Sequence, residues 1–189
     1  LGEVIKRFDS PPVVALTATA TPEVKEDIVK QLGIDNPQMT ITGFERPNLQ
    51  FGVFNVQKSL KTRTIIDSIE KMPGGSGIVY VGTRQKVDEI VQLLLDIGIE
   101  AAAYHAVMEA DSRKWVQDKF MQDKIRVIVA TNAFGMGIDK SNIRFVIHHD
   151  MPGTLEAYYQ EAGRAGRDGR KAGAILLFSP ADEKLPEKR

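Results

Sequence analysis

Residues 78–98 read IVYVGTRQKVDEIVQLLLDIG, a short apolar run followed by a longer pattern of helical period. The run at residues 78–81 is typical of a buried strand, and a further short strand is expected at residues 100–104. Between them, Gly98 stops a helix whose inward face repeats at helical spacing, with Val87, Ile90, Val91, Leu94 and Leu95. A strand–helix–strand unit of this kind indicates a parallel sheet covered by helices.

The same alternation continues in both directions along the chain. Further strands are expected at residues 13–16, 49–56, 126–130, 145–148 and 174–178, and helices at residues 22–32, 59–71, 111–122 and 154–165. Thr21 and Thr154 are interpreted as N-caps, Pro22 as a first helical residue and Gly33 as a helix stop. The sequence therefore predicts an α/β fold with a mostly parallel sheet flanked by helices. Such sheets bind ligands beyond the carboxyl ends of their strands.

Composition narrows the class of protein without naming a ligand. The chain has 189 residues, of which 42% are hydrophobic, so we expect a packed core rather than disorder. Its 25 basic residues balance 25 acidic ones, which neither supports nor excludes a nucleic-acid partner. The lack of cysteine excludes disulfides and cysteine-ligated zinc within this chain, and no apolar run is long enough for a membrane span. Because the chain begins at Leu1 rather than methionine, we expect it to be an excised piece.

Two of the turns that follow strands carry groups suited to phosphate. After Val81 come Gly82, Thr83 and Arg84 at the expected start of a helix, where free amides and the positive dipole end attract anions. The alternative interpretation makes Thr83 only an N-cap and leaves Arg84 in solvent.

The turn after Ala130 spans residues 131–139. Thr131 and Asn132 can donate to phosphate, and Gly137 permits close approach of the backbone. Asp139 can accept from a ribose hydroxyl or from an arginine. The alternative is a tight turn around a core phenylalanine, and both interpretations remain open here.

A second decisive stretch is QEAGRAGRDG at residues 160–169. On a helix, Gln160, Arg164 and Arg167 share one face, and arginine presents a rigid fork suited to phosphate oxygens. Gly163 and Gly166 weaken the helix, so the alternative places Arg167 on a loop. Yet the chain contains no G-x-x-x-x-G-K-[ST] phosphate loop and no Asp-Glu pair after an apolar strand. Arginines without these parts fit the role of an arginine finger, in which one module completes a site on another.

The histidines give a weaker signal. His148 and His149 are adjacent on an expected strand, so their side chains point to opposite faces and do not readily chelate one ion. We therefore predict no metal site in this chain. His105 follows an expected strand at a position where a binding role is possible.

Taken together, these residues resemble the core of superfamily 2 helicases, and most closely the RecQ family of DNA helicases. The resemblance runs from about residue 13 to residue 182. Its most specific part is the motif VI-like stretch at 158–169. The others are a motif III-like stretch at 17–21, FERPNL at 44–49, a motif IV-like stretch at 80–84, AYHA at 103–106 and a motif V-like stretch at 129–140. One departure is Val107-Met108, where the family usually has glycine and leucine.

The resemblance implies a RecA-like fold of the P-loop NTPase type, in a lobe that lacks its own phosphate loop. Residues 1–43 would be a remnant of the first RecA-like lobe and residues 44–189 the second lobe. ATP with Mg²⁺ would be held mainly by the absent first lobe, and zinc would be bound only in the full-length protein. The implied activity is that of an ATP-dependent 3′→5′ DNA helicase. Its partners would be single-stranded DNA, duplex junctions and the first lobe, without a membrane, in the bacterial cytoplasm or a nucleus.

The resemblance also implies roles for individual residues. Arg167 would be the arginine finger at the γ-phosphate, and Arg164 would contact the phosphates or brace the motif, although which arginine reaches the γ-phosphate stays open. Gln160 and Asp139 would orient the arginines or meet the ribose, and Gly137 would lie beside the nucleotide. The strand's phosphates would be held by Thr83, Arg84, His105, Thr131 and Asn132. The isolated chain is expected not to hydrolyse ATP.

Two alternatives share this fold. One is a non-enzymatic nucleic-acid-binding module that has kept the helicase architecture, and the other is an RNA-directed helicase of the same superfamily. A small-molecule Rossmann enzyme fits least, because no glycine-rich fingerprint follows the first strand.

Overall fold

The computed structural model describes residues 2–8, 11–17, 21–41, 46–72, 74–131, 134 and 138–184. The chain divides into two compact units, Leu1–Glu45 and Arg46–Arg189. The smaller unit contains helices α1 (Gly2–Arg7) and α2 (Pro22–Leu32). Helix α1 was not anticipated by the sequence analysis.

Helix α2 begins and ends where the sequence predicts. The Thr21 hydroxyl accepts a hydrogen bond from the Val24 amide at 3.4 Å, and Gly33 closes the helix with φ of 64°. The strand expected at residues 13–16 is wrong, because these residues are extended but have no strand partner. A strand needs a neighbour for its backbone groups, and the described part of this unit contains no other strand.

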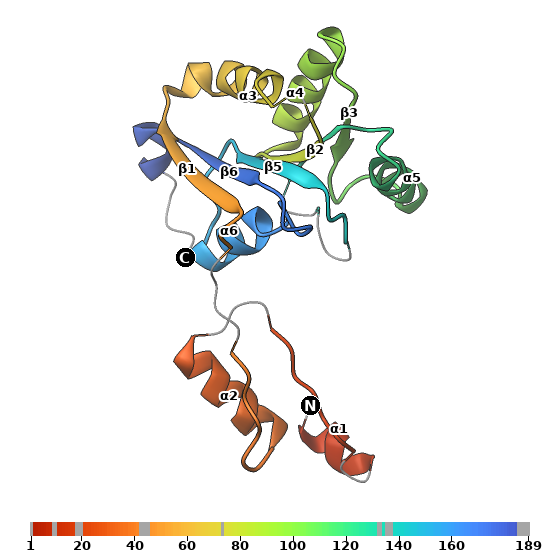
Figure 1. The fold of residues 1–189 in the computed structure, drawn as a ribbon, viewed down its shortest axis with the longest axis vertical. Coiled ribbons are helices and arrows are strands. Elements are labelled where there is room, and N and C mark those ends of the chain that lie inside the picture. The colour runs from red at the N-terminus through yellow and green to blue at the C-terminus, as the bar shows by residue number, and fades with distance from the viewer. Residues whose placement is uncertain are drawn as a thin grey trace. The chain divides into compact units, whose positions relative to one another are not determined.

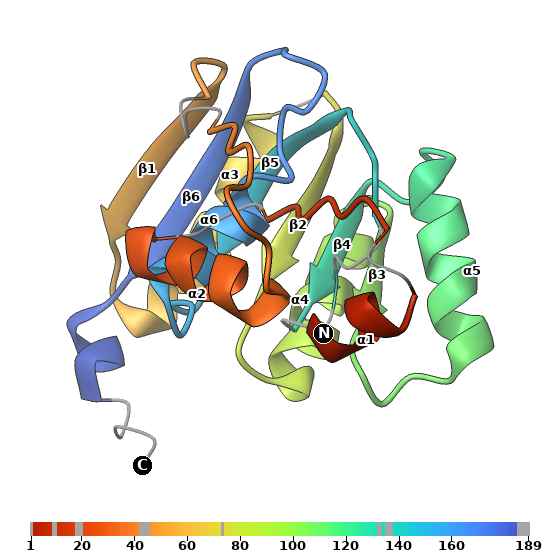
Figure 2. The same cartoon turned by 90° about the horizontal axis from the view of Figure 1, so that it is seen from below.

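The larger unit is a parallel sheet with helices on both faces (Figure 1). Its strands lie in the order β1-β6-β5-β2-β4-β3, and every neighbouring pair is parallel (Figure 2). Their bounds are β1 Leu49–Asn55, β2 Ser76–Tyr80, β3 Ala101–Tyr104, β4 Val127–Ala130, β5 Ile143–His148 and β6 Ala172–Phe178. The α-helices are α3 Lys61–Glu70, α4 Arg84–Asp96, α5 Ala110–Met121 and α6 Leu155–Ala162, with short 3₁₀ turns η1 Lys58–Leu60 and η2 Pro180–Lys184.

The core has two layers because successive strand residues face opposite sides of the sheet. Ile78 and Tyr80 of β2 pack in the cluster that contains residues of α5 and α6. Val79, between them, packs in the cluster formed with α3 and α4. Figure 1 shows α3 and α4 on one side of the sheet and α6 on the other. The predicted α/β fold with a parallel sheet is therefore confirmed.

One predicted helix is too long. Helix α6 ends at Ala162, three residues before the expected end, although Thr154 caps its start as predicted by accepting from the Ala157 amide at 3.1 Å. The sequence Gly163-Arg164-Ala165-Gly166 explains the early end. Gly163 closes the helix, and Gly166 has a φ of 65°, which is incompatible with helix.

Candidate functional site

Four of the predicted nucleic-acid-binding residues lie at the carboxyl ends of adjacent strands. Thr83 and Arg84 follow β2, Thr131 follows β4 and His105 follows β3, and these three strands are neighbours in the sheet. The turns are tied together, because the Val81 amide donates to Ala130 at 2.9 Å and the Thr131 amide to Tyr104 at 3.3 Å. Thr83 and Arg84 are exposed. The structure thus brings the four residues onto one edge of the sheet.

The turn at Gly82 is held by a residue that the sequence analysis missed. Asp150, just beyond β5, accepts a hydrogen bond from the Gly82 amide at 2.6 Å. A side chain at Gly82 would bring its Cβ to 3.0 Å from the Asp150 carboxylate, so glycine suits this position. Burial raises the pKa of Asp150, but hydrogen bonds from His149 and Gly82 and the charge of Lys61 outweigh it and leave the pKa lowered. A charged Asp150 therefore fixes the start of α4.

The N-cap interpretation of Thr83 is confirmed. Its hydroxyl oxygen accepts from the Lys86 amide at 3.3 Å, which satisfies one of the free amides of α4. The hydroxyl hydrogen is not used in that contact, so capping and phosphate binding are compatible. The phosphate role remains a prediction.

The backbone of the segment that carries the predicted nucleotide-binding arginines reaches the opposite edge of the sheet, although the Arg164 side chain lies near Tyr80. The segment after α6, which we call the arginine loop (residues 163–170), returns to the amino-terminal ends of the strands: the Gly166 amide donates to Ile143 at 2.8 Å. Arg164 and Arg167 both lie beyond the helix that carries Gln160. The expectation of one shared helix face is therefore wrong, because Gly163 closes the helix before either arginine.

The structure pairs Arg167 with Asp139. The guanidinium Nη1 lies 2.9 Å from the Asp139 carboxylate and 3.3 Å from the Ile138 carbonyl oxygen. The Arg167 side chain is 36% exposed, so the carboxylate orients the guanidinium without burying it. Asp139 is one of the two residues, with Gln160, that were expected to orient the arginines. Gln160 is exposed on α6, whereas Asn132 and Gly137 lie outside the described residues.

Arg164 lies beside a buried aromatic cluster under the sheet. His148 stacks on Tyr80 with ring centroids 5.1 Å apart, meets Tyr158 edge-on, and places Nε2 at 2.8 Å from the Glu161 carboxylate. Burial raises the pKa of the Tyr80 phenol, while the nearby Arg164 guanidinium acts in the opposite direction. His148 is therefore a buried residue of the larger unit, packed between aromatic rings.

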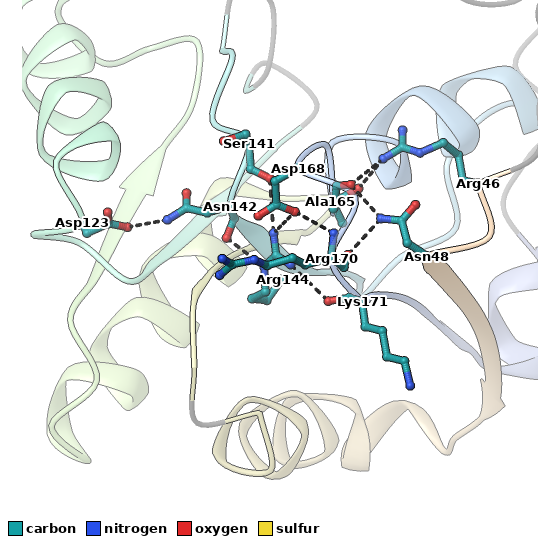
Figure 3. Close-up of polar contacts among 11 residues, drawn as sticks. Arg46, Asn48, Asp123, Ser141, Asn142, Arg144, Ala165, Asp168, Arg170 and Lys171 are labelled. Atoms are coloured by element: carbon teal, nitrogen blue, oxygen red, sulfur yellow. Dashed lines mark hydrogen bonds and ion pairs between the residues drawn. The ribbon is translucent and has the colours of Figure 1, made fainter.

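The arginine loop is also held from within the sheet by Arg144 (Figure 3). Its Nη2 lies 2.7 Å from Asp168, and the same guanidinium donates to the carbonyls of Ser141, Asn142 and Lys171. The Arg144 hydrogen bond lowers the pKa of Asp168, so this pair is charged at neutral pH. No sequence pattern pointed to Arg144, because its partners in and beside the loop, Asp168 and Lys171, are 24 and 27 residues away.

Neither a metal centre nor a membrane span stands out in the part of the chain that the structure describes. None of its groups of histidine, aspartate or glutamate could hold a metal ion. Among the same residues, every helix is too short or too polar to cross a bilayer. The arginine loop instead carries the guanidinium groups of Arg164, Arg167 and Arg170, which suit an anionic ligand.

Comparisons with known proteins point to one family. The family described as "Helicase conserved C-terminal domain" matches residues 60–169. The chain is 50% identical over 174 residues to the ATP-dependent DNA helicase RecQ of Bacillus subtilis (strain 168), covering 92% of this chain and 29% of that protein. It is 43% identical over 184 residues to the RecQ-like DNA helicase BLM of Xenopus laevis, covering 96% of this chain and 14% of that protein. The resemblance to RecQ helicases is therefore confirmed.

Solved structures agree on the fold. A DEAD box protein from Methanococcus jannaschii matches with a TM-score of 0.68 at 25% identity, over 87% of this chain and 45% of that chain. S. cerevisiae Dbp5, solved bound to RNA and ADP BeF3, matches with a TM-score of 0.77 at 23% identity, over 93% of this chain and 47% of that chain. These likenesses confirm the predicted RecA-like architecture.

Proposed function

Since this chain belongs to the family of helicase conserved C-terminal domains, we propose that it is the second motor lobe of an ATP-dependent 3′→5′ DNA helicase of RecQ type. The chain spans only 29% of the RecQ protein of Bacillus subtilis, so the whole protein's activity is part of the proposal. Residues 1–43 are assigned to the first lobe and residues 44–189 to the second.

The observation that carries the proposal is the orientation of Arg167 on the arginine loop. Asp139 and the Ile138 carbonyl hold one nitrogen of its guanidinium, which stays partly exposed and free to meet an anion. A guanidinium fixed in this way stabilises charge that develops on a transferring phosphoryl group. We assign Arg167 as the arginine finger, with Arg164 on the phosphates and Asp139 and Gln160 as their orienting groups.

The groups on the arginine loop fit a nucleotide better than they fit its metal. ATP with Mg²⁺ supplies the phosphoanhydride bond whose hydrolysis drives the motor. Arg164 and Arg167 would bind its phosphate oxygens, and Gln160 and Asp139 would hold these guanidinium groups or meet the ribose. Among the described residues no cluster of carboxylates accompanies them, and we assign the Mg²⁺ to the first lobe.

The opposite edge of the sheet is assigned to the translocated strand. Thr83, Arg84, His105 and Thr131 lie on adjacent turns there, and hydroxyl and guanidinium groups suit phosphate oxygens. Phosphate contacts carry little sequence information, so binding is expected to tolerate any sequence. The carboxyl edge of the sheet would bind the DNA strand, and the arginine loop would bind the phosphates of ATP.

The test is Arg167→Ala in the full-length protein. DNA-stimulated ATP turnover should fall by about a thousandfold or more, with single-stranded DNA affinity unchanged. Arg63→Ala is the matched control, since Arg63 is a 71% exposed arginine that pairs with Asp67 on α3. Turnover that survives the Arg167 change would rule out the finger assignment. Unwinding of an RNA duplex in preference to DNA would instead favour an RNA-directed enzyme.

A further inference from the structure

Two residues at the start of the larger unit hold the carbonyl groups of the arginine loop (Figure 3). Arg46 Nη2 donates to the carbonyls of Ala165 and Gly166, each at 3.0 Å, and Nη1 donates to Gly163 at 3.4 Å. Asn48 Nδ2 donates to Gly166 at 2.7 Å and to Arg170 at 2.9 Å. These contacts bridge 117 to 122 residues of sequence, so they belong to the fold and not to a local turn.

The loop needs such donors because α6 ends just before it. The last carbonyls of a helix have no intrahelical partner, and the dipole makes that end attractive to a cation. Arg46 places its positive charge near this end of α6 and donates to the carbonyls of Gly163, the C-cap, and of Ala165 and Gly166 just beyond it. Gly166 turns its carbonyl toward Asn48 through a φ of 65°, and a Cβ there would lie 2.5 Å from Asn48 Nδ2. The loop, its glycine and the two donors therefore fit one another closely.

Both side chains are suited to this task in a way that their usual substitutes are not. Arg46 spreads two nitrogens of one rigid fork over three carbonyls, which the single ammonium group of lysine cannot match. Asn48 uses one amide nitrogen for two carbonyls, and aspartate has the same shape without any donor when ionised. Asn48 is itself fixed, because its carbonyl accepts from the Ala172 amide at 2.9 Å where β1 meets β6.

Arg46 also occupies a special place along the chain. The smaller unit ends at Glu45 and the larger unit begins at Arg46, so Arg46 is the first residue of the larger unit to meet the connection between them. Pro47 follows and restricts the backbone between the two donors.

We propose that Arg46 and Asn48 are positioning residues that set the arginine loop for nucleotide. The proposal rests on the assignment of Arg167 as the arginine finger. Loss of Arg46 removes the side-chain donor of the Gly163 and Ala165 carbonyls, and loss of Asn48 removes that of the Arg170 carbonyl. Either loss loosens the loop and lets Arg167 leave its working position. Misplacement of a catalytic group by about 1 Å is enough to slow chemistry about a hundredfold.

The experiment uses Arg46→Ala, Arg46→Lys and Asn48→Asp in the full-length protein, with Arg63→Ala as the exposed-arginine control. Hydrogen–deuterium exchange of the peptide spanning residues 160–172 should become at least about tenfold faster in R46A and N48D, and less so in R46K. DNA-stimulated kcat should fall about 10- to 100-fold in R46A, with partial rescue in R46K and DNA affinity unchanged. The R46A/R167A double variant should be no slower than R167A alone, because Arg46 acts through Arg167.

Unchanged exchange of the 160–172 peptide in both R46A and N48D would overturn the proposal, even if turnover fell. A double variant slowed by the product of the two single effects would also overturn it, since Arg46 would then act independently of Arg167. If R167A retains turnover, the finger assignment fails, while faster exchange in R46A and N48D still supports their hold on the loop. The exchange readout therefore separates failure of this proposal from failure of the proposed function.

Discussion

Gly166 and Gly98 have left-handed backbones in very different surroundings. Their φ angles are 65° and 78°, but a Cβ at Gly166 would meet Asn48 at 2.5 Å, whereas a Cβ at Gly98 meets nothing within 4 Å. Alanine at either position carries the backbone penalty of roughly 1–2 kcal/mol for a left-handed residue. Only the change at Gly166 adds a steric clash, of the order of 1–3 kcal/mol.

We predict that Gly166→Ala lowers the free energy of unfolding by more than Gly98→Ala does. Urea denaturation of both variants checks the difference, and the Gly98 variant serves as the control for backbone strain alone. Equal losses would mean that the loop relaxes away from Asn48 without cost, contrary to the tight fit described above.

Single residues with local partners could be assigned from sequence, and those with distant partners could not. Thr21, Gly33 and Thr154 act within a few residues of their own positions, so capping rules located them correctly. Arg144 and Asp150 gain their roles only through turns that the fold brings together. No spacing rule within the chain predicts such contacts.

At the scale of an element, the start of α4 combines a cap with a predicted phosphate contact. Aspartate is as good an N-cap as threonine, but its negative charge repels phosphate. We predict that Thr83→Asp leaves the free energy of unfolding within about 0.5 kcal/mol of the wild type. Single-stranded DNA affinity of the full-length protein should fall about tenfold, as measured by titration at fixed salt.

Thr83→Ser is the companion control, because serine keeps both the cap and the hydroxyl. Wild-type affinity in the aspartate variant would show that the strand's phosphates do not approach this helix start. A large loss of stability in that variant would contradict the simple capping role.

The turn after α5 is joined to the starts of two strands through Asp123. Its carboxylate accepts from Lys140 at 2.7 Å, from Ser76 at 3.1 Å and from Asn142 at 3.3 Å. The Lys140 hydrogen bond is the main reason that the pKa of Asp123 lies below its ordinary value of 3.8. A carboxyl group with a lowered folded-state pKa stabilises the fold above its unfolded pKa, and this contribution is lost as the pH falls through the lowered value.

We therefore predict that Asp123→Asn flattens the acid limb of the stability curve below about pH 4. Asparagine suits the change because Asp123 has a φ of 58°, which asparagine also tolerates. Chemical denaturation across a pH series measures the slope. An unchanged slope would mean that the three donors do not lower the pKa of Asp123.

Elements were predicted best where their ends carry local signals. The end of α6 was misjudged because the apolar pattern continues through Ala165, which is buried, while the backbone has already left the helix. The strand expected at residues 13–16 is not formed for the opposite reason. Its local pattern is adequate, but the described residues of the smaller unit contain no strand that could pair with it. Secondary structure thus depends on partners as well as on pattern.

At the scale of the larger unit, a buried ion pair joins its first α-helix, α3, to its last short helix, η2. Lys61 at the start of α3 is fully buried and lies 2.6 Å from Asp182 in η2, and it also donates to the His149 carbonyl at 2.6 Å. The Arg63–Asp67 pair on the same helix is exposed by comparison. Removing one member of a buried pair leaves an uncompensated charge and typically costs 3–5 kcal/mol, whereas exposed pairs contribute less than about 1 kcal/mol.

We predict that Asp182→Asn lowers the free energy of unfolding by about 3 kcal/mol and that Asp67→Asn lowers it by less than about 1 kcal/mol. Thermal or urea unfolding of the two variants gives the comparison. Similar small losses would mean that water reaches Lys61 once its partner is neutral.

The sheet order could not be predicted from the sequence, although the alternation of strands and helices predicted its parallel character. Strand β6 lies between β1 and β5, so the last strand in the chain is inserted between two earlier ones. Strand β6 pairs with β1 over the whole length of both strands and with β5 from Phe145 to His148. The same insertion brings the arginine loop, which precedes β6, against Asn48, which precedes β1.

The length of β5 has a consequence for inhibitors. Five residue steps separate Ile143, beside the arginine loop, from His148, near the opposite edge, which is roughly 16 Å at about 3.3 Å per step. A compound that binds only at Arg167 and Asp139 would leave Thr83 and His105 uncovered. On the proposed assignment, we expect such a compound to block ATP turnover without displacing DNA, so that the protein stays bound to the strand without moving along it.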